Sequence, residues 1–223
     1  MPAKPRSYAS PLRAESAQRT RRAVLEAARE LFLSAGYVQT TIEQIADRAG
    51  VSRPTVFSSV GNKATVLKEL RDVTLAGDDE PVPVLQRSWF QEAFVEPKPA
   101  RSIQLHARNV TRIYARYAAL DEVVRQAAAT TEELAGFWTT FEGQRKVGAE
   151  AFIDSLLGKT PLRDGLARDT AVEVLWVVGA ADPYLRYVRD CGWSADSYQA
   201  WLAQTLCDAL LPTAARPRVR LWP

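Results

Sequence analysis

The sequence predicts an all-α protein of two domains, and three observations support this fold class. Apolar side chains recur three and four positions apart along most of the 223 residues, which places them on one face of a helix. No run shows the strict alternation of apolar and polar residues that a half-buried strand requires. The segment GDDEPVP at residues 77–83 breaks the periodicity, because glycine and proline favour turns and loops. We therefore expect a small helical domain before this loop and a larger one after it.

The first predicted helix runs from Arg19 to Ala35 and is terminated by Gly36. Its apolar stripe consists of Val24, Ala27, Ala28, Leu31, Phe32 and Ala35. Together with the two shorter helices predicted after it, this helix completes a three-helix bundle.

Residues 1–18 are rich in Pro, Ser, Ala and Arg and have no apolar periodicity, so we predict a disordered arm there. A free tail and an arm that reaches a DNA minor groove through Lys4, Arg6 and Arg13 both fit this composition. The arm lacks the apolar stretch of about 7–15 residues that a secretion signal needs, which favours a cytoplasmic protein.

A helix-turn-helix pattern lies between Gln39 and Lys63. The apolar stripe of its first helix is Ile42, Ile45, Ala46 and Ala49. Thr40 and Glu43 have the spacing of a capping box at the start of this helix. Gly50 can adopt the left-handed conformation that ends a helix at little cost.

The second helix of the pattern begins at Ser52, a favourable N-cap, and has Pro54 in its first turn. Val56 and Val60 face inward. The outer face carries Arg53, Thr55, Ser58 and Ser59, with Phe57 at its edge. A helix of this size with these donors suits a DNA major groove, although the same spacing also occurs in an ordinary αα-hairpin.

Charge is distributed unevenly along the chain, and this favours a nucleic-acid partner. Residues 1–71 contain 12 Lys and Arg against 6 Asp and Glu, a net charge of +6, whereas the remaining residues have a net charge of −3. The overall net charge of +3 therefore hides a basic N-terminal domain. Phosphate contacts by such a domain supply most of the sequence-independent affinity for DNA.

The sequence across residues 19–71 resembles the TetR family of bacterial transcription regulators. Three segments carry the resemblance: ARELFLSAGY, TTIEQIADRAGVS and PTVFSSVGNKATVLKEL. The resemblance implies a small N-terminal DNA-binding domain, a connecting helix, and a larger all-α domain that dimerises and binds an effector.

The resemblance also implies which residues contact DNA. Arg53 and Thr55 would approach base edges, and Thr41 and Lys63 would hold phosphates from the starts of their helices. The amide groups at the helix start near Lys63 suit an anion independently of the resemblance. The full set of candidate DNA-binding residues is Thr40, Thr41, Arg53, Pro54, Thr55, Phe57, Ser58, Ser59 and Lys63.

Three residues of the second helix depart from the family pattern. Phe57 stands where a tyrosine commonly donates its hydroxyl to a phosphate, Ser59 replaces a frequent aromatic residue or histidine, and Val60 replaces a frequent phenylalanine. One missing neutral hydrogen bond costs about 1 kcal/mol, so we expect a reduced rather than an abolished DNA affinity.

The second domain is predicted to be helical throughout. A connecting helix is predicted at 62–73, before the loop. The predicted helices of the second domain are 84–94, 102–119, 121–129, 134–156, 172–178 and 198–210. We expect a DNA-binding domain with its connecting helix at 19–76, an effector-binding and dimerisation domain at 84–212, and a basic tail at 213–223.

Residues 171–211 are predicted to form a homodimer interface. The helix around Trp176 is apolar nearly all round until Asp182 and Pro183 interrupt it, so it must be buried on more than one side. Two such helices from each chain would form a four-helix bundle with twofold symmetry. Packing within one chain alone is the alternative.

Aromatic residues of the second domain are candidates for lining an effector pocket. We select His106, Tyr114, Phe137, Trp138, Phe141 and Trp176, because small-molecule sites are largely apolar with a few polar groups. The expected effector is a largely apolar small molecule, and plain core packing is the alternative for each residue.

The residue inventory argues against an enzyme. The chain has one histidine and no G-x-S-x-G, G-x-G-x-x-G or Walker sequence. Two cysteines, Cys191 and Cys207, cannot form a zinc site of the usual spacing with that histidine, so we expect no metal and no cofactor. No stretch approaches the about 20 apolar residues of a membrane helix.

These observations predict a repressor that binds a pseudo-palindromic DNA operator as a dimer and is released by a small-molecule effector. The alternative is an effector-binding or scaffold protein of the same fold whose DNA binding is weakened by the three departures.

Overall fold

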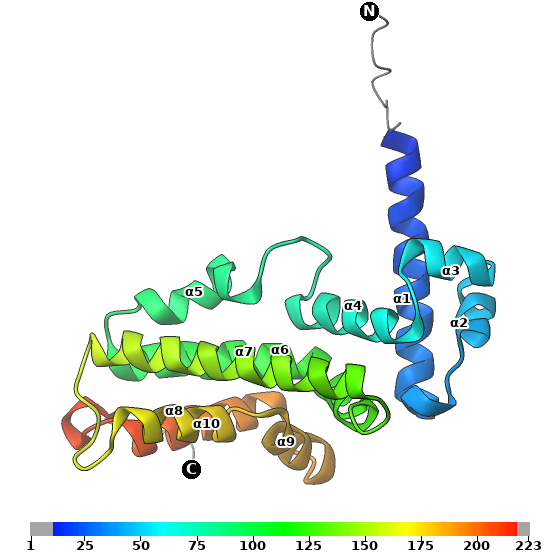
Figure 1. Cartoon of the computed structure of the whole chain (residues 1–223). Coiled ribbons are helices and arrows are strands. Elements are labelled where there is room, and N and C mark those ends of the chain that lie inside the picture. Colours follow the sequence, from blue (N-terminus) through cyan, green and yellow to red (C-terminus); the bar gives the residue numbers. More distant parts are fainter. Residues whose placement is uncertain (1–10, 218–223) are drawn as a thin grey trace, which may run out of the picture. The chain divides into compact units, whose positions relative to one another are not determined.

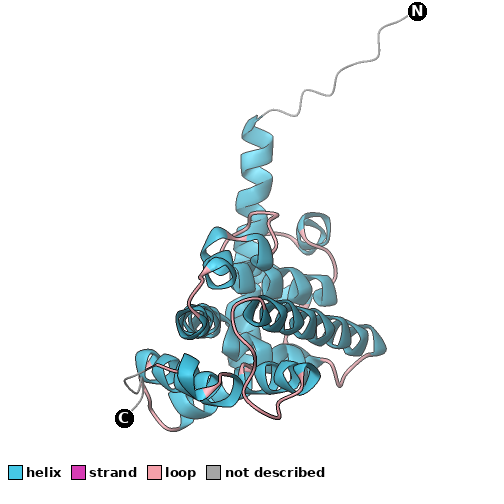
Figure 2. Ribbon diagram, turned by 90° about the vertical axis from the view of Figure 1, so that its left-hand side faces the viewer, coloured by secondary structure: helices cyan, strands magenta, loops and turns pink. Residues whose placement is uncertain are grey.

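The computed structural model describes residues 11–217, and the chain divides into an N-terminal unit, residues 1–72, and a C-terminal unit, residues 73–223. The described residues contain helices and loops but no strand (Figure 2), as the sequence predicted. The α-helices are α1 (Pro11–Gln39), α2 (Ile42–Ala49), α3 (Arg53–Ser59), α4 (Lys63–Ala76), α5 (Ser88–Val95), α6 (Pro99–Ala127), α7 (Glu132–Leu157), α8 (Arg168–Val178), α9 (Ala181–Tyr184) and α10 (Ala195–Leu210). No helix in this part of the chain is long and apolar enough to cross a membrane.

The N-terminal unit is a small bundle in which α1, α2 and α3 pack against one another (Figure 1). Its core side chains are fully buried and come from all three helices and from the first turns of α4: Val24, Ala28, Phe32, Ile45, Val56, Val66 and Leu67. The stripes predicted from the sequence therefore form one core. Because α2 and α3 have only eight and seven residues, this shared core stabilises them more than their own helix propensity does.

Helix α1 is longer than the sequence predicted. It begins at Pro11, so residues 11–18, which we expected in a disordered arm, are helical, and residues 1–10 lie outside the described part. Proline is favourable at the first position of a helix, and the segment RAESAQRTRRA that follows contains mainly good helix formers. The helix is interrupted at Gly36, whose φ of 81° is not helical, which agrees with the predicted terminator.

The C-terminal unit is built around α6, against which α5, α7, α9 and α10 pack. Helix α8 packs against α7 and α10. The predicted helices 102–119 and 121–129 are one continuous helix, because Leu120, Val123 and Val124 extend the buried stripe of α6 and no glycine or proline separates the two segments. Helix α8 ends at Val178, and Pro183 lies in the first turn of α9.

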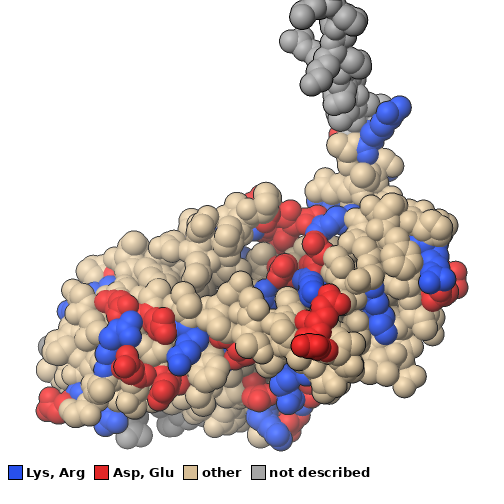
Figure 3. Space-filling model, in the orientation of Figure 1, with Lys and Arg blue, Asp and Glu red and all other residues tan. Residues whose placement is uncertain are grey.

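Other short segments complete the C-terminal unit. The predicted stretch 84–94 divides into a 3-10 turn, Val84–Gln86, and α5. A π-helical segment, Leu185–Asp190, follows α9. On the face drawn in Figure 3, acidic and basic side chains of this unit lie beside one another. Arg168 and Asp154 form one of the ion pairs of this unit.

Candidate nucleic-acid interface

The turn between α2 and α3 is fixed by local hydrogen bonds at both helix ends. Gly50 has φ 67° and ψ 32° and ends α2 in the left-handed conformation, which costs a residue without a side chain little. The Val51 amide donates to Ala46 O at 3.0 Å. The hydroxyl of Ser52 accepts a hydrogen bond from the Thr55 amide at 3.3 Å, so Ser52 is the N-cap of α3. The predicted turn is confirmed.

The capping box at the start of α2 is one residue later than predicted. The Gln44 amide donates to the Thr41 hydroxyl at 3.2 Å, and the Thr41 amide donates to Gln44 Oε1 at 2.8 Å. Thr40 is instead fully buried, and its hydroxyl donates to Gly36 O at 2.8 Å. Our assignment of Thr40 as a DNA contact is therefore corrected, because its side chain is enclosed and its donor is occupied. Thr41 is exposed at the start of α2.

The outer face of α3 is exposed while its inner face is buried. Val56 has no exposed surface, whereas the Arg53 side chain is 60% exposed and Phe57 is 45% exposed. The Arg53 guanidinium lies 5.7 Å from the centre of the Phe57 ring, within the range of a cation–π contact. Pro54 is exposed in the first turn.

The hydroxyl groups of α3 form short-range hydrogen bonds. Ser52 Oγ and Thr55 Oγ1 are 2.7 Å apart, Ser58 Oγ donates to Thr55 O at 3.2 Å, and Ser59 Oγ donates to Val56 O at 3.3 Å. Each hydroxyl keeps acceptor capacity and can rotate towards another partner. Ser58 is exposed, and Thr55 and Ser59 are half-buried.

Arg53 is paired with an acidic residue that our sequence reasoning missed. Its Nη1 atom lies 3.0 Å from Glu43 Oε1, and the Glu43 side chain is 55% exposed. The two residues belong to different helices, α2 and α3, so no spacing along one helix indicates the pair. An aspartate or glutamate on a surface facing DNA repels phosphates, so Glu43 lowers the positive charge that Arg53 offers.

Lys63 stabilises the N-terminal unit directly. Its ammonium donates to Tyr37 O at 3.0 Å and to Thr40 O at 2.8 Å, and it lies 4.3 Å from the centre of the Tyr37 ring. Burial lowers the pKa of Lys63. An ammonium has three donors, so one remains for a phosphate. At the start of α4, Asn62 Oδ1 accepts the Thr65 amide at 2.9 Å, which occupies one of the amides expected to bind an anion.

Helix α1 contributes two further cations to the N-terminal unit. Arg19 and Arg22 are exposed, and no carboxylate within residues 11–217 forms an ion pair with either. Arg21 differs because it pairs with Glu69, and Arg48 on α2 donates to Glu30 at 2.7 Å. Exposed arginines of this kind are free to contact phosphates.

The residues selected for the effector pocket lie in two places. Around the end of α8, the Tyr114 hydroxyl donates to Gly179 O at 2.8 Å, and Arg145 donates to Trp176 O at 3.0 Å. The Arg145 guanidinium is 5.4 Å from the Trp176 ring centre, and the Trp176 Nε1 atom is buried without a hydrogen-bond partner. Tyr114 and Trp176 are therefore linked through the same carbonyl end of α8.

The remaining selected aromatic residues lie on α7 and α6. Trp138 and Phe141 are in contact with ring centres 5.8 Å apart, and Phe137 is half-buried. His106 stacks on Phe152 at 4.2 Å, and burial lowers its pKa to about 4, so it is neutral at pH 7. His106 precedes Tyr114 by eight residues, which is about 12 Å along a helix.

Known proteins with similar sequences are regulators. Residues 24–70 match the family described as bacterial regulatory proteins, tetR family. The uncharacterized HTH-type transcriptional regulator YdeS of Bacillus subtilis (strain 168) is 28% identical over 159 residues, which cover 70% of this chain and 74% of YdeS.

Solved structures show the same fold at low sequence identity. NalD, described as the secondary repressor of the MexAB-OprM multidrug efflux pump in Pseudomonas aeruginosa, has a TM-score of 0.65 at 24% identity, covering 88% of this chain and 97% of NalD. The SmeT–triclosan complex has a TM-score of 0.65 at 18% identity, covering 92% of this chain and 98% of SmeT. SmeT is the repressor of the Stenotrophomonas maltophilia multidrug efflux pump SmeDEF. The matched helix-turn-helix and the regulators of similar sequence show that this chain carries the N-terminal domain of the tetR family of bacterial regulatory proteins.

Proposed function

We propose that this protein is a cytoplasmic transcriptional repressor that binds a pseudo-palindromic DNA operator as a homodimer and is released from it by a small-molecule effector. The observation that carries the proposal is the outer face of α3, where Arg53 and Phe57 are exposed on a helix whose inner face is buried. The fold shared with NalD, a repressor, supports the same direction of regulation.

The chemistry of α3 suits base recognition in a major groove. An arginine can form two hydrogen bonds with O6 and N7 of guanine, and hydroxyl groups such as that of Thr55 can bind several bases. Phe57 has no hydroxyl for a phosphate but offers an apolar edge to a thymine methyl group. Thr41, Lys63, Arg19 and Arg22 are positioned to contact phosphates, which orient the domain without reading sequence.

A homodimer through residues 171–211 would supply the second recognition helix. Val177 on α8 is 58% exposed in the single chain, so a charge introduced there would lie in the proposed interface. We expect Val177→Asp to convert the dimer to a monomer in analytical ultracentrifugation. Val95→Asp on α5 is the matched control, since Val95 is 75% exposed and lies outside the proposed interface. A variant that remains dimeric at Val177 would place the interface elsewhere.

The proposed effector site lies near Trp176 and Tyr114. A buried indole N–H without a partner is costly, and an effector with an acceptor group would satisfy Trp176 Nε1. The buried His106 Nδ1 atom also lacks a partner and is a second polar group for a larger ligand. The solved complex of SmeT with triclosan supports the binding of a small molecule by this fold.

The proposed mechanism depends on the spacing of two recognition helices. Half-sites of a dimeric helix-turn-helix protein lie about 34–36 Å apart in successive major grooves. An effector that binds preferentially to a dimer with another spacing withdraws the protein from DNA. A difference of about 3 kcal/mol between the two states would weaken operator affinity about a hundredfold.

The experiment that tests this function is selection of bound duplexes from a random pool with the purified protein, followed by titration of the selected sequence. We expect Arg53→Ala to lose affinity by about 10- to 100-fold. Arg101→Ala is the control, because Arg101 is an exposed arginine on α6 outside the N-terminal unit.

The same experiment also distinguishes the repressor from the alternative function. If no duplex is enriched, or if Arg53→Ala and the control bind the selected duplex equally well, the chain acts as an effector-binding or scaffold protein with weakened DNA binding. Binding that does not weaken between low and moderate salt would likewise argue against phosphate contacts by the N-terminal unit.

A further inference from the structure

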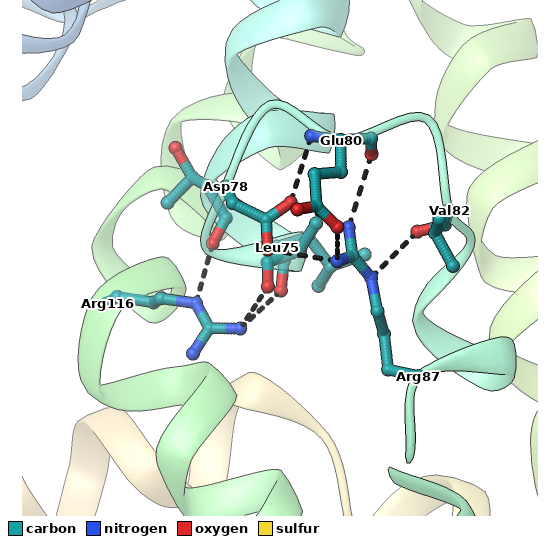
Figure 4. A network of polar contacts seen from close by, with 8 residues as sticks. Leu75, Asp78, Glu80, Val82, Arg87 and Arg116 are labelled. Carbon is teal, nitrogen blue, oxygen red and sulfur yellow. Dashed lines mark hydrogen bonds and ion pairs between the residues drawn. The ribbon is translucent and has the colours of Figure 1, made fainter. Parts of the chain in front are cut away.

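The C-terminal unit contains a mainly polar cavity of about 440 Å³ that is separate from the aromatic residues around Trp176. It lies between the C-terminal end of α4, the loop at residues 77–87, the start of α5 and the middle of α6. Figure 4 shows two arginines that reach this region from different elements, Arg87 from the end of the loop and Arg116 from α6. A cavity of this size accommodates a small organic molecule.

One of these arginines is neutralised within the loop. Arg87 is 8% exposed and pairs with Asp78 at 2.7 Å and with Glu80 at 3.0 Å, and its Nε atom donates to Val82 O at 3.0 Å. These contacts hold the loop closed on itself (Figure 4). The carboxylates of Asp78 and Glu80 in the cavity wall are therefore paired with Arg87, which lies in the same wall.

The second arginine is held by backbone carbonyls instead of by a carboxylate. Arg116 donates to Thr74 O at 2.8 Å, to Leu75 O at 2.7 Å and to Ala76 O at 3.1 Å. These are carbonyls of the last turn of α4, which carry partial negative charge. At Gly77, with φ 88°, an added Cβ would lie 3.0 Å from the Arg116 Cζ atom. The glycine therefore lets the guanidinium fit closely, which fixes it in place.

A third arginine has no acidic partner. Arg112 is exposed, and no carboxylate in the described part of the chain forms an ion pair with it. Its guanidinium lies 5.1 Å from the centre of the Trp89 ring, and that of Arg116 lies 5.9 Å from the same centre. Together, Arg87, Arg112 and Arg116 against Asp78 and Glu80 leave the cavity wall with an excess of one positive charge.

We propose that this cavity binds a small organic monoanion, a carboxylate attached to a flat apolar group. The carboxylate pairs with Arg112, where it relieves the repulsion between Arg112 and Arg116. The flat group packs against Trp89. Arginine recognises a carboxylate through two parallel hydrogen bonds, which gives the site orientation as well as affinity. The fixed Arg116 makes the site pre-organised, so little ordering accompanies binding.

The test uses the full-length protein without DNA, so it does not depend on the proposed repressor function. Benzoate is the probe, and benzamide is its neutral counterpart of the same shape. Tryptophan indole N–H signals are followed by NMR, with the Trp89 signal assigned through Trp89→Phe. We expect benzoate to shift the Trp89 signal with a Kd of about 1 mM or tighter, and benzamide to leave it unchanged.

Two variants that each replace one arginine by glutamine then show where the carboxylate of benzoate binds. Arg112→Gln should weaken benzoate binding by about tenfold or more, the usual effect of losing a hydrogen bond to a charged group. Arg101→Gln, which removes an exposed arginine from the same helix outside the cavity, should bind benzoate like the unaltered protein.

Several results would overturn the proposal. These are no movement of the Trp89 signal at benzoate concentrations well above 1 mM, an equal response to benzamide, or equal weakening in Arg112→Gln and Arg101→Gln. Since Arg112 is exposed and repelled by a neighbour, its replacement should leave the helical circular dichroism unchanged, which separates loss of binding from loss of fold.

Discussion

The cationic side chains near the candidate sites of the two units differ in their surroundings, although each unit also contains cations of the other kind. In the N-terminal unit, Arg53 and Arg48 lie at the surface and pair with exposed carboxylates of other helices. In the C-terminal unit, Arg87, Arg116 and Arg145 are withdrawn from water and donate to backbone carbonyls. The hydrogen bonds of a cation therefore show whether it is free to meet a partner or stabilises the fold. Its position in the sequence does not show this.

Lys63 shows that the distinction holds residue by residue. It belongs to the N-terminal unit, yet its ammonium binds the carbonyls of Tyr37 and Thr40 as the arginines of the C-terminal unit bind theirs. Such a cation satisfies carbonyl groups that a helix end leaves without partners.

Arg145→Met should destabilise the protein by about 2–3 kcal/mol, because it leaves the half-buried Glu142 carboxylate and two backbone carbonyls without their donor. Arg145 is 22% exposed, pairs with Glu142 at 3.0 Å and donates to Trp176 O at 3.0 Å and to Gly179 O at 3.3 Å. The free energy of unfolding from urea titration measures the loss. Arg53→Met in the N-terminal unit should change it by less than about 1 kcal/mol, as exposed pairs do.

A double variant separates the charge from the packing. Glu142→Gln added to Arg145→Met removes the carboxylate left without a partner, so part of the lost stability should return. If the double variant is as unstable as Arg145→Met, packing of the arginine on Trp176 accounts for the loss. Equal losses in Arg145→Met and Arg53→Met would contradict the difference between the units.

Asp121→Asn should stabilise the protein at pH 7. Burial, and then the charge of Glu142, raise the pKa of Asp121 to about 6, well above the usual pKa of an aspartate. Because the pKa of Asp121 is higher in the folded state than in the unfolded state, the folded state favours the protonated carboxyl. The contribution of this group to stability is fully present below its pKa in the unfolded state and is lost as pH rises towards 6. The variant keeps a neutral group throughout, so we expect a gain of about 2 kcal/mol above pH 6 that shrinks towards pH 4.

The measurement is urea unfolding of both proteins between pH 4 and pH 7.5. Asp154→Asn is the control of opposite sign, since the hydrogen bond from Arg168 lowers the pKa of Asp154 and the charged form is favoured in the folded state. That variant should gain nothing at pH 7. A pH-independent gain in Asp121→Asn would mean that its cause is packing and not ionisation.

The sequence was sufficient for the turn between α2 and α3 because its signals are local. Gly50, Ser52 and the apolar stripe of α2 act within a few residues, and each lies where the pattern placed it. The capping box was displaced by one position because both Thr40 and Thr41 can cap, and only the burial of Thr40 against Gly36 decides between them.

The parts that the sequence could not predict depend on contacts between distant residues. Glu43 meets Arg53 across two helices, and Arg116 meets the last turn of α4 about 40 positions away in the sequence. The aromatic residues chosen for an effector pocket share hydrophobic character, but only their contacts group Tyr114 with the end of α8 and His106 with Phe152. Periodicity assigns a side chain to a helix face and leaves its neighbours on other helices open.

Glu43→Gln should have the smallest effect and should strengthen DNA binding by about three- to tenfold at low salt. The change removes a negative charge from the DNA-facing side and releases Arg53 from its pair, and rim charges act mainly on association and salt dependence. Fluorescence anisotropy with the selected duplex measures the affinity at two salt concentrations. Glu26→Gln is the control, because Glu26 is exposed on α1 and pairs with Arg29 instead. A weaker affinity in Glu43→Gln would show that the carboxylate orients Arg53 for base contact. The ion pair of Glu43 with Arg53 would then contribute to DNA recognition, whereas the pair of Arg145 with Glu142 contributes to stability.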